Sequence, residues 1–218
     1  MVHYSVKAKA DETVLIRAND LAKPLVIALY KEILRAGAHP RLSVGFDELN
    51  EIFYREASAK QLSAFPKISM LEAKNISAMI AISSPLNLKG MSGVDPKRMV
   101  KRYQALKPIN EWITTKVRWV IANYPAASLA QEAEMALEEY EDFVYSACLL
   151  DWERKKKEMA RIARVLEKGD TLLIKGKEKV DIGIQCGFLY SFNCVRERRH
   201  LGHRNQEVEC EVLEEEKA

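Results

Sequence analysis

The sequence has few cysteines and no long apolar run. Only four of its 218 residues are cysteine, and none precedes Cys148. No apolar run reaches the ~18–20 residues that a membrane-spanning helix needs. The opening residues, Met-Val-His-Tyr-Ser-Val-Lys, lack the apolar segment of a signal peptide. Together these absences predict a reduced, cytoplasmic protein that is not inserted in a membrane.

A strong excess of one charge is also absent. The chain has 34 basic and 31 acidic residues, which gives a formal net charge of +3. This near balance gives no reason to expect nucleic acid or an anionic membrane as a partner. With 48% hydrophobic and 30% charged residues, the chain can bury the core of one domain, with room for an appendage. Its many lysines and glutamates would suit a thermophile.

Familiar catalytic and phosphate-binding motifs are missing as well. The sequence contains no His-Glu-x-x-His pair and no Gly-x-Ser-x-Gly turn. Gly90 and Gly93 do not form a dinucleotide fingerprint, and we expect them to shape the loop before Asp95. The sequence therefore assigns no catalytic, cofactor-binding or metal-binding residue.

What is present is an alternation of apolar strands and amphipathic helices. The expected strands are Thr13–Arg17, Arg41–Val44, Ala78–Ile82, Val117–Ile121, Thr171–Ile174 and Val180–Ile184, the last pairing antiparallel at an edge. The expected helices begin at Asp20, Asp47, Ile68 and Asp95, and they end near Arg35, Leu62, Ala73 and Leu106. Gly37 suits the left-handed residue that closes the first helix.

Ala78–Ile82 is the clearest buried strand, because it is apolar throughout and lies between helices. Such runs are typical of a parallel sheet covered on both faces, and we expect this strand to be central together with Val117–Ile121. The pattern predicts an α/β fold: a three-layer, doubly wound, mainly parallel (Rossmann-like) sheet with helices on both faces. Residues 1–185 would form this domain.

A long helix is predicted after Tyr124-Pro125, where the proline ends the preceding strand. Its apolar residues recur at steps of three and four, which indicates one buried face. Cys148 lies on this face, so we expect its thiol to be buried and inert. The residues of the face are Tyr140, Val144, Ala147, Cys148, Met159, Ile162 and Leu166.

The order of residues in Arg118–Glu153 points to a family. The stretch contains Arg118-Trp119, Tyr124-Pro125, Ala130-Gln131, Met135, Glu138–Val144, Ala147-Cys148 and Leu150–Trp152. In this order it resembles the thermophilic aminopeptidases of the aminopeptidase T type, and weaker similarity extends over residues 10–184. Ala136 departs from the pattern, since the family tends to have serine or threonine there. That change removes a helix cap worth ~1 kcal/mol.

The resemblance implies the amino-terminal domain of a metal-dependent aminopeptidase, which removes amino-terminal residues from peptides. A pair of divalent metals, zinc, cobalt or similar, would activate the attacking water in the full-length family. The resemblance places the metal ligands in a carboxyl-terminal half, so none is carried over to this chain, which we expect to be inactive alone. The implied partner is a separate catalytic half or a second copy in a homo-oligomer such as a dimer.

Several charged side chains have simpler interpretations than catalysis. The basic run Arg154–Lys157 falls on solvated helix positions and does not argue for nucleic acid. His39 follows a helix and is expected to be packed or exposed rather than catalytic. Four clustered carboxylates suit the solvated face of a helix near its amino terminus, namely Glu138, Glu139, Glu141 and Asp142.

Residues 186–218 differ in composition from the rest of the chain, because they contain three of the four cysteines and two of the four histidines. Their spacing lacks the Cys-x₂₋₄-Cys pair of a structural zinc site. We therefore expect no zinc here, and a tail that is truncated or frame-shifted relative to the family. The residues considered as ligands are Cys186, Cys194, His200, His203 and Cys210.

A second hypothesis needs no catalysis. The chain would then be a stand-alone α/β protein that binds a ligand or a partner at the carboxyl ends of its strands, where open α/β sheets place their sites.

Overall fold

The computed structural model describes residues 1–166, 171–175 and 181–185. The chain forms two compact units, residues 1–145 and a second unit that begins at Ser146.

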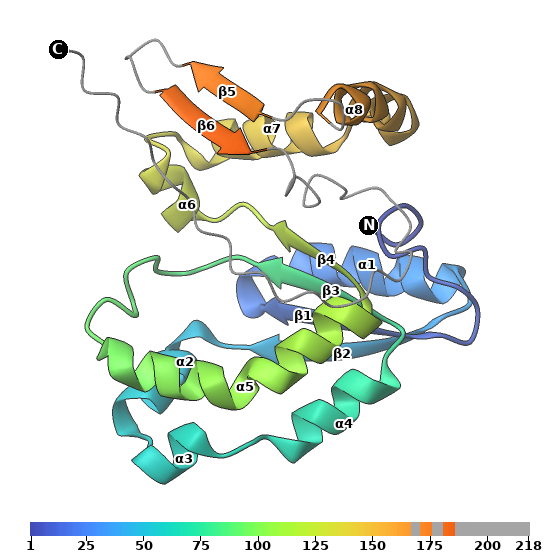
Figure 1. Cartoon of the computed structure of the whole chain (residues 1–218). Coiled ribbons are helices and arrows are strands. Elements are labelled where there is room, and N and C mark those ends of the chain that lie inside the picture. Colours follow the sequence, from blue (N-terminus) through green and yellow to red (C-terminus); the bar gives the residue numbers. More distant parts are fainter. Residues whose placement is uncertain (167–170, 176–180, 186–218) are drawn as a thin grey trace, which may run out of the picture. The chain divides into compact units, whose positions relative to one another are not determined.

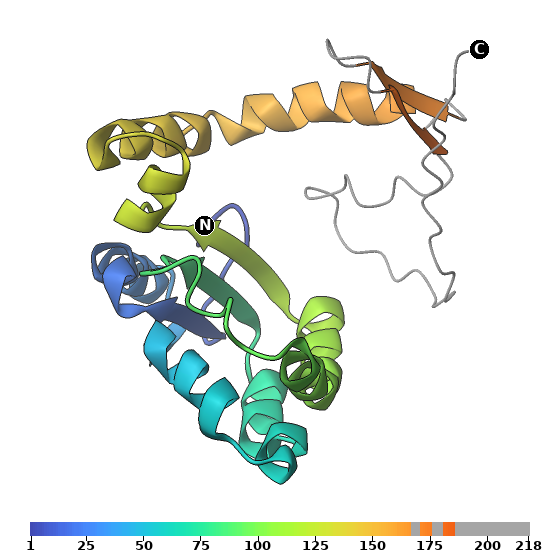
Figure 2. The same cartoon turned by 90° about the vertical axis from the view of Figure 1, so that its left-hand side faces the viewer.

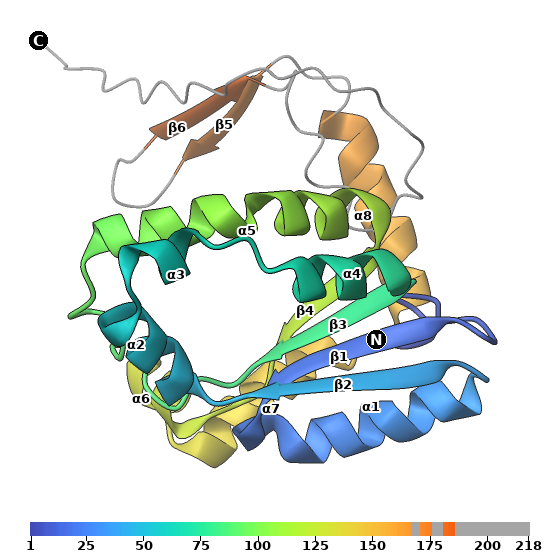
Figure 3. The ribbon, with the colours of Figure 1, turned by 90° about the horizontal axis from the view of Figure 1, so that it is seen from below.

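A four-stranded parallel sheet organises the first unit (Figures 1 and 3). Its strands are β1 (Thr13–Asn19), β2 (His39–Gly45), β3 (Ala78–Ser83) and β4 (Arg118–Asn123), in the order β2-β1-β3-β4. Every neighbouring pair is parallel. Parallel strands need crossovers on the faces of the sheet, and the chain supplies them as helices.

The two faces of the sheet are covered by different helices, because successive side chains of a strand point to opposite faces. Val14 and Ile16 pack with α1 (Lys23–Arg35) in one apolar cluster. Leu15 belongs to a second cluster, with residues of α4 (Lys67–Asn75) and α5 (Pro96–Lys116). Figure 2 shows α1 and the α4–α5 layer on opposite sides of the sheet. The predicted three-layer α/β fold is confirmed.

The other elements are shorter or lie in the second unit. A 3-10 turn, Asp20–Ala22, precedes α1. The remaining helices are α2 (Asp47–Glu56), α3 (Ala59–Ser63), α6 (Ala127–Glu132), α7 (Leu137–Cys148) and α8 (Trp152–Leu166). The strands β5 (Thr171–Lys175) and β6 (Asp181–Gln185) pair antiparallel with each other. They form a two-stranded sheet of their own, so the expected place of the sixth strand at an edge of the main sheet is wrong.

Local signals placed some helix ends correctly and missed others. Gly37 closes α1 with φ of +75°, as predicted. The single helix predicted from Asp47 is wrong, because Ser58 forms a capping box with Gln61 and begins a new helix there. The helix from Asp95 continues past Pro108 to Lys116, although the proline removes one hydrogen-bond donor. Buried residues beyond the proline favour the longer helix.

The predicted central position of Val117–Ile121 is wrong. In the described part of the chain β4 is the last strand of its sheet, next to β3 alone. Its residues alternate between half-buried and exposed, and Ile121 is 60% exposed. Ala78–Ile82 does lie inside the sheet, between β1 and β4.

The predicted long helix with one buried face is also wrong. It divides into α6, α7 and α8, with Glu134 in a left-handed conformation (φ +56°) after α6. The carboxylate of Asp151 accepts a hydrogen bond from the backbone N–H of Arg154 and so caps a separate α8. Cys148 is exposed rather than buried. Met159 and Ile162 are exposed as well.

Candidate functional site

The topology directs attention to the carboxyl ends of β1 and β3. From β1 the chain crosses to β2 on one side, and β3 then lies on the other side of β1. In doubly wound sheets ligands bind at this reversal of strand order, outside the carboxyl ends of the two strands. Asn19 is the last residue of β1, and Ser84 follows the last residue of β3.

Four residues at this edge form a polar cluster, which we call the carboxyl-edge cluster: Asn19, Asp47, Ser84 and Leu86. The side-chain amide of Asn19 donates a hydrogen bond to the backbone carbonyl of Ser84. The same amide nitrogen lies 3.4 Å from each oxygen of the Asp47 carboxylate. The backbone N–H of Leu86 donates to Asp47 Oδ2 at 2.9 Å. The cluster thus ties together the chain segments that follow β1, β2 and β3.

Asp47 reaches the cluster because α2 is held in place by α5. Arg98 of α5 donates from Nε to the carbonyl of Tyr54 at 2.6 Å, and its guanidinium also bonds the carbonyl of Ala57. These carbonyls belong to the carboxyl end of α2, where helical partners are missing and a cation is favourable. Arg98 therefore fixes one end of α2, and Asp47 occupies the other.

Two buried polar atoms of the cluster lack a partner among the described residues. They are Oδ1 of Asn19 and the hydroxyl oxygen of Ser84. Ser84 is fully buried. Such atoms normally have a partner, and each could accept a hydrogen bond from a donor. Among the described residues no base is hydrogen-bonded to the Ser84 hydroxyl, so these residues offer hydrogen bonding and not the paired base that activates a nucleophile.

The residues weighed from the sequence lie elsewhere. His39 is exposed at the start of β2, and its Nε2 lies 4.0 Å from Oδ1 of Asp11. Three of the four clustered acids of α7 are exposed and Glu141 is half-buried, which agrees with a solvated face. Arg154–Lys157 lie at the start of α8, not in the middle of a helix. The considered zinc ligands, Cys186 to Cys210, lie outside the described residues.

The described residues do not fit a metal centre. Within residues 1–166 and the two short strands, no three side chains of His, Cys, Asp or Glu are grouped so that they could hold an ion. Likewise no helix in this part of the chain is long and apolar enough to cross a membrane.

Replacing Asn19 with alanine is expected to lower the free energy of unfolding by about 1–3 kcal/mol, because the buried carbonyl of Ser84 then loses its donor. Ser84→Ala is the matched control. The Ser84 hydroxyl has no hydrogen-bond partner within the part of the chain that the structure describes, so the change in unfolding free energy should be within about 0.5 kcal/mol of zero, or stabilising. Urea unfolding of the unaltered chain and of the two variants measures both changes in the free energy of unfolding. An equal loss in both variants would show that the hydroxyl is bonded.

Comparison with known proteins identifies a family and a solved structure of similar fold. The model of the thermophilic metalloprotease family matches residues 1–202 of the chain. Among solved structures, wild-type AmpT from Thermus thermophilus is similar, with a TM-score of 0.61 and 18% identity. The match covers 80% of this chain and 50% of AmpT, so the chain spans about half the length of that relative. No curated protein matches the sequence significantly.

Proposed function

The chain belongs to the thermophilic metalloprotease family, and on that premise we propose that it is the amino-terminal domain of a metal-dependent aminopeptidase. Such an enzyme removes amino-terminal residues from peptides. The observation that carries the proposal is the family match over residues 1–202, which includes the whole parallel sheet. The similar fold of AmpT supports it.

We further propose that this domain does not catalyse the reaction by itself. Divalent metal would supply the Lewis acid that polarises the scissile carbonyl and activates water. The described residues do not fit such a centre, and the chain spans half of AmpT. The ligands would therefore come from a separate catalytic half. In this arrangement residues 1–185 form the α/β domain and residues 186–218 a divergent tail.

The purified chain is expected to leave aminoacyl-p-nitroanilides uncleaved, with or without added zinc, cobalt or manganese. Removal of the metal ligands should abolish the metal route, not merely slow it. The assay follows release of p-nitroaniline across the fractions of a final sizing column, so that a contaminating host peptidase is separated from the chain.

A full-length member of the same family, prepared and assayed identically, is the positive control. Metal-dependent turnover that follows the chain through the column would contradict the proposal. It would then be traced with substitutions of Cys194 and His200, two of the ligands considered in the tail.

A second candidate function rests on the carboxyl-edge cluster. The orphaned oxygens of Asn19 and Ser84 lie at the reversal of strand order, where α/β domains bind small ligands. A stand-alone binding protein would use this edge without catalysis. Both functions are compatible with self-association, and we propose that the chain forms a homo-oligomer when a catalytic half is not supplied.

A further inference from the structure

The helices α3, α4 and α5 of the first unit are strongly basic. Together they contain nine bases and two acids, a net charge of +7, whereas the whole chain has a net charge of only +3. Both acids have a basic partner. Glu72 lies 3.4 Å from Nε of Arg41, and Glu111 lies 3.8 Å from Nζ of Lys107. The near balance of the total charge therefore conceals a basic layer on one side of the sheet.

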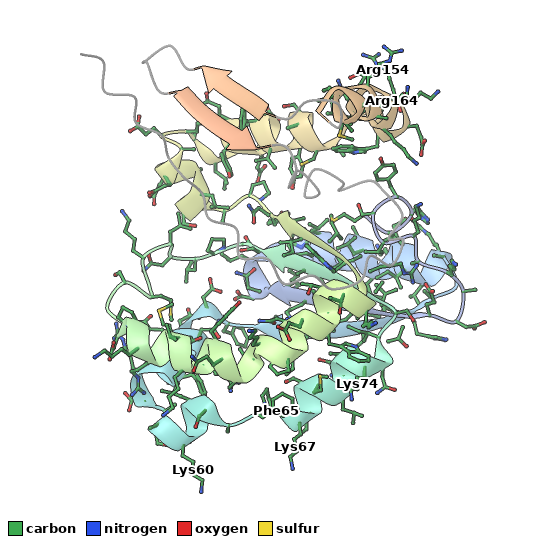
Figure 4. All side chains as sticks on the ribbon, in the orientation of Figure 1. Lys60, Phe65, Lys67, Lys74, Arg154 and Arg164 are labelled. Atoms are coloured by element: carbon green, nitrogen blue, oxygen red, sulfur yellow. The ribbon has the colours of Figure 1, made fainter. Side chains whose placement is uncertain are left out.

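The outer side of α3 and α4 presents lysines and apolar side chains together. We call this side the α3–α4 surface, and its six exposed residues are Lys60, Phe65, Lys67, Ile68, Leu71 and Lys74. Figure 4 shows Lys60 and Lys67 extending away from the sheet, with Phe65 between the two helices. Lys67, Leu71 and Lys74 follow one another at steps of four and three, so they lie on one side of α4.

The apolar residues of this surface are not needed by the core. Ile68 is 85% exposed, the highest value among the large apolar residues of the described chain, and Leu71 is 64% exposed. The helix α4 contributes other residues, Met70 and Ala73, to the apolar cluster that it shares with the sheet. Both sides of α4 thus carry apolar residues, but only the inner side is packed in the core. Side chains such as Ile68 would gain free energy by leaving water for hydrocarbon.

The charges of the α3–α4 surface are lysines that have no carboxylate partner. Among the described residues no ion pair involves Lys60, Lys67 or Lys74. Lys74 lies over the ring of Trp112, 5.4 Å from its centroid. A lysine is a point charge on a flexible stem, whereas the planar guanidinium of arginine matches a carboxylate held in one place. Lysines therefore favour a fluid anionic partner over a folded acidic protein.

We propose that the α3–α4 surface binds the face of an anionic lipid bilayer. Phe65, Ile68 and Leu71 enter the boundary between headgroups and acyl chains, while the lysines keep their ammonium groups among the anionic headgroups. The charge of +7 on the three helices complements the negative potential of such a bilayer. Binding stays at the lipid–water interface, so it needs no membrane-spanning helix. The proposal does not depend on the peptidase assignment.

Other classes of partner match only part of this surface. A second copy bound through the same surface would bring lysines against lysines, and like charges repel. Nucleic acid would attract the lysines, but its hydrated sugar-phosphate backbone offers no apolar region for Ile68 and Leu71 to enter. An anionic bilayer supplies both anionic headgroups for the lysines and hydrocarbon for the apolar side chains.

Flotation of the full chain with lipid vesicles tests the proposal. The vesicles contain phosphatidylcholine alone, or phosphatidylcholine with about 40% phosphatidylglycerol, which is anionic. The bound fraction at increasing lipid concentration gives the affinity. The chain should bind the anionic vesicles at least about tenfold more tightly than the neutral ones. Binding should weaken as salt is raised from about 100 to about 500 mM, because the attraction of the lysines is then screened.

Two double variants separate the contribution of charge from that of insertion. Lys60→Glu with Lys67→Glu reverses two charges, and Ile68→Ser with Leu71→Ser removes the two most exposed apolar side chains of the surface. Each double variant should bind the anionic vesicles at least about tenfold more weakly than the unaltered chain. All four side chains are exposed, so the melting temperatures should stay close to that of the unaltered chain and show that both variants are folded.

The matched controls lie on α1, which Figure 2 shows on the other side of the sheet. Lys23→Glu with Lys31→Glu changes the net charge by the same amount as the charge variant. Ile27→Ser with Leu34→Ser removes apolar side chains that are 46% and 53% exposed. Both controls should keep their affinity for anionic vesicles within about threefold of the unaltered chain, because charges beyond the Debye length are largely screened.

Several results would overturn the proposal. The unaltered chain could fail to float with anionic vesicles, or the α1 controls could lose as much affinity as the α3–α4 variants. Loss in the charge variant alone, with the serine variant unaffected, would contradict insertion of Ile68 and Leu71. Binding to a single-stranded oligonucleotide but not to vesicles, abolished by Lys60→Glu with Lys67→Glu, would assign the surface to nucleic acid. None of these results affects the outcome of the peptidase assay.

Discussion

Replacing Ile80 with alanine is expected to lower the free energy of unfolding by about 2–5 kcal/mol, the usual range for a buried isoleucine. Ile80 is fully buried in β3, opposite Ile16 of β1 and Val120 of β4. It belongs to the apolar cluster that joins the sheet to α1. The cavity would lie in the middle of the sheet, where neighbours on both sides restrict collapse.

The matched control is Ile121→Ala, one strand away. Ile121 is 60% exposed, so its truncation should cost no more than about 1 kcal/mol. Urea unfolding at neutral pH, with the slope against denaturant compared between variants, measures both losses. If the two substitutions destabilise equally, the Ile121 side chain is covered in solution, which would contradict its exposed position on β4.

Replacing Arg118 with methionine is expected to lower the free energy of unfolding by about 2–3 kcal/mol, because its hydrogen bonds involve a charged group and the Glu12 carboxylate is left without its charged partner. The guanidinium donates to the backbone carbonyl of Lys7 at 2.7 Å and to the carboxylate of Glu12. It thereby ties the amino-terminal segment to the beginning of β4. Urea unfolding of the variant measures the loss. Arg35→Met, which removes an exposed ion pair with Glu32, is the control, and its loss should be much smaller than that of Arg118→Met because solvent screens the pair.

The same ion pair makes part of the stability depend on pH. Burial raises the pKa of Glu12. Hydrogen bonds from Arg118 and from the backbone N–H of Lys9, together with the charge of Arg118, lower this pKa by more than burial raises it. The net folded pKa lies below the ordinary 4.5. The stabilisation is therefore complete above the unfolded pKa and is lost as the pH falls through the folded one.

Glu12→Gln should consequently flatten the acid side of the stability profile. Unfolding free energies measured between neutral pH and about pH 3 should converge for the variant and the unaltered chain at the acid end. Parallel profiles with a constant difference would show that Glu12 does not titrate as a partner of Arg118.

The elements of the fold were predictable where local chemistry decides them. Ala78–Ile82 is apolar throughout and could only be a buried strand, and Gly37 supplies a conformation that other residues resist. The ends of α2 and α5 were missed, because a capping box at Ser58 and apolar packing beyond Pro108 outweighed the simpler signals. Helix ends of this kind depend on contacts as much as on composition.

The position of β4 could not be predicted, since its apolar run resembles that of an inner strand. The apolar residues Trp119–Ile121 predict a strand. The order of strands in the sheet decides which of their side chains are buried. The same limit applies to α8, whose apolar residues predicted a buried face that nothing in the described chain covers. Periodicity identifies the side of an element, and only tertiary structure identifies its neighbour.

The carboxyl-edge cluster was missed for a related reason. A polar residue directly after an apolar strand is a visible signal, and both Asn19 and Ser84 provide it. Their contact joins residues 65 positions apart, and it arises because β1 and β3 are adjacent in the sheet. Once that adjacency is known, the two polar ends must meet.

The two edge strands of the sheet, β2 and β4, differ in the N–H donors that they could offer to a further strand. The N–H of His39 points inward, to the carbonyl of Glu12 at 2.8 Å, so the next residue of β2 faces outward. That residue is Pro40, which has no N–H to offer an incoming strand. The strand β4 contains no proline between Arg118 and Asn123. Within the described residues, Pro40 thus removes one of the N–H donors that β2 could offer to an incoming strand, whereas β4 keeps all of its own.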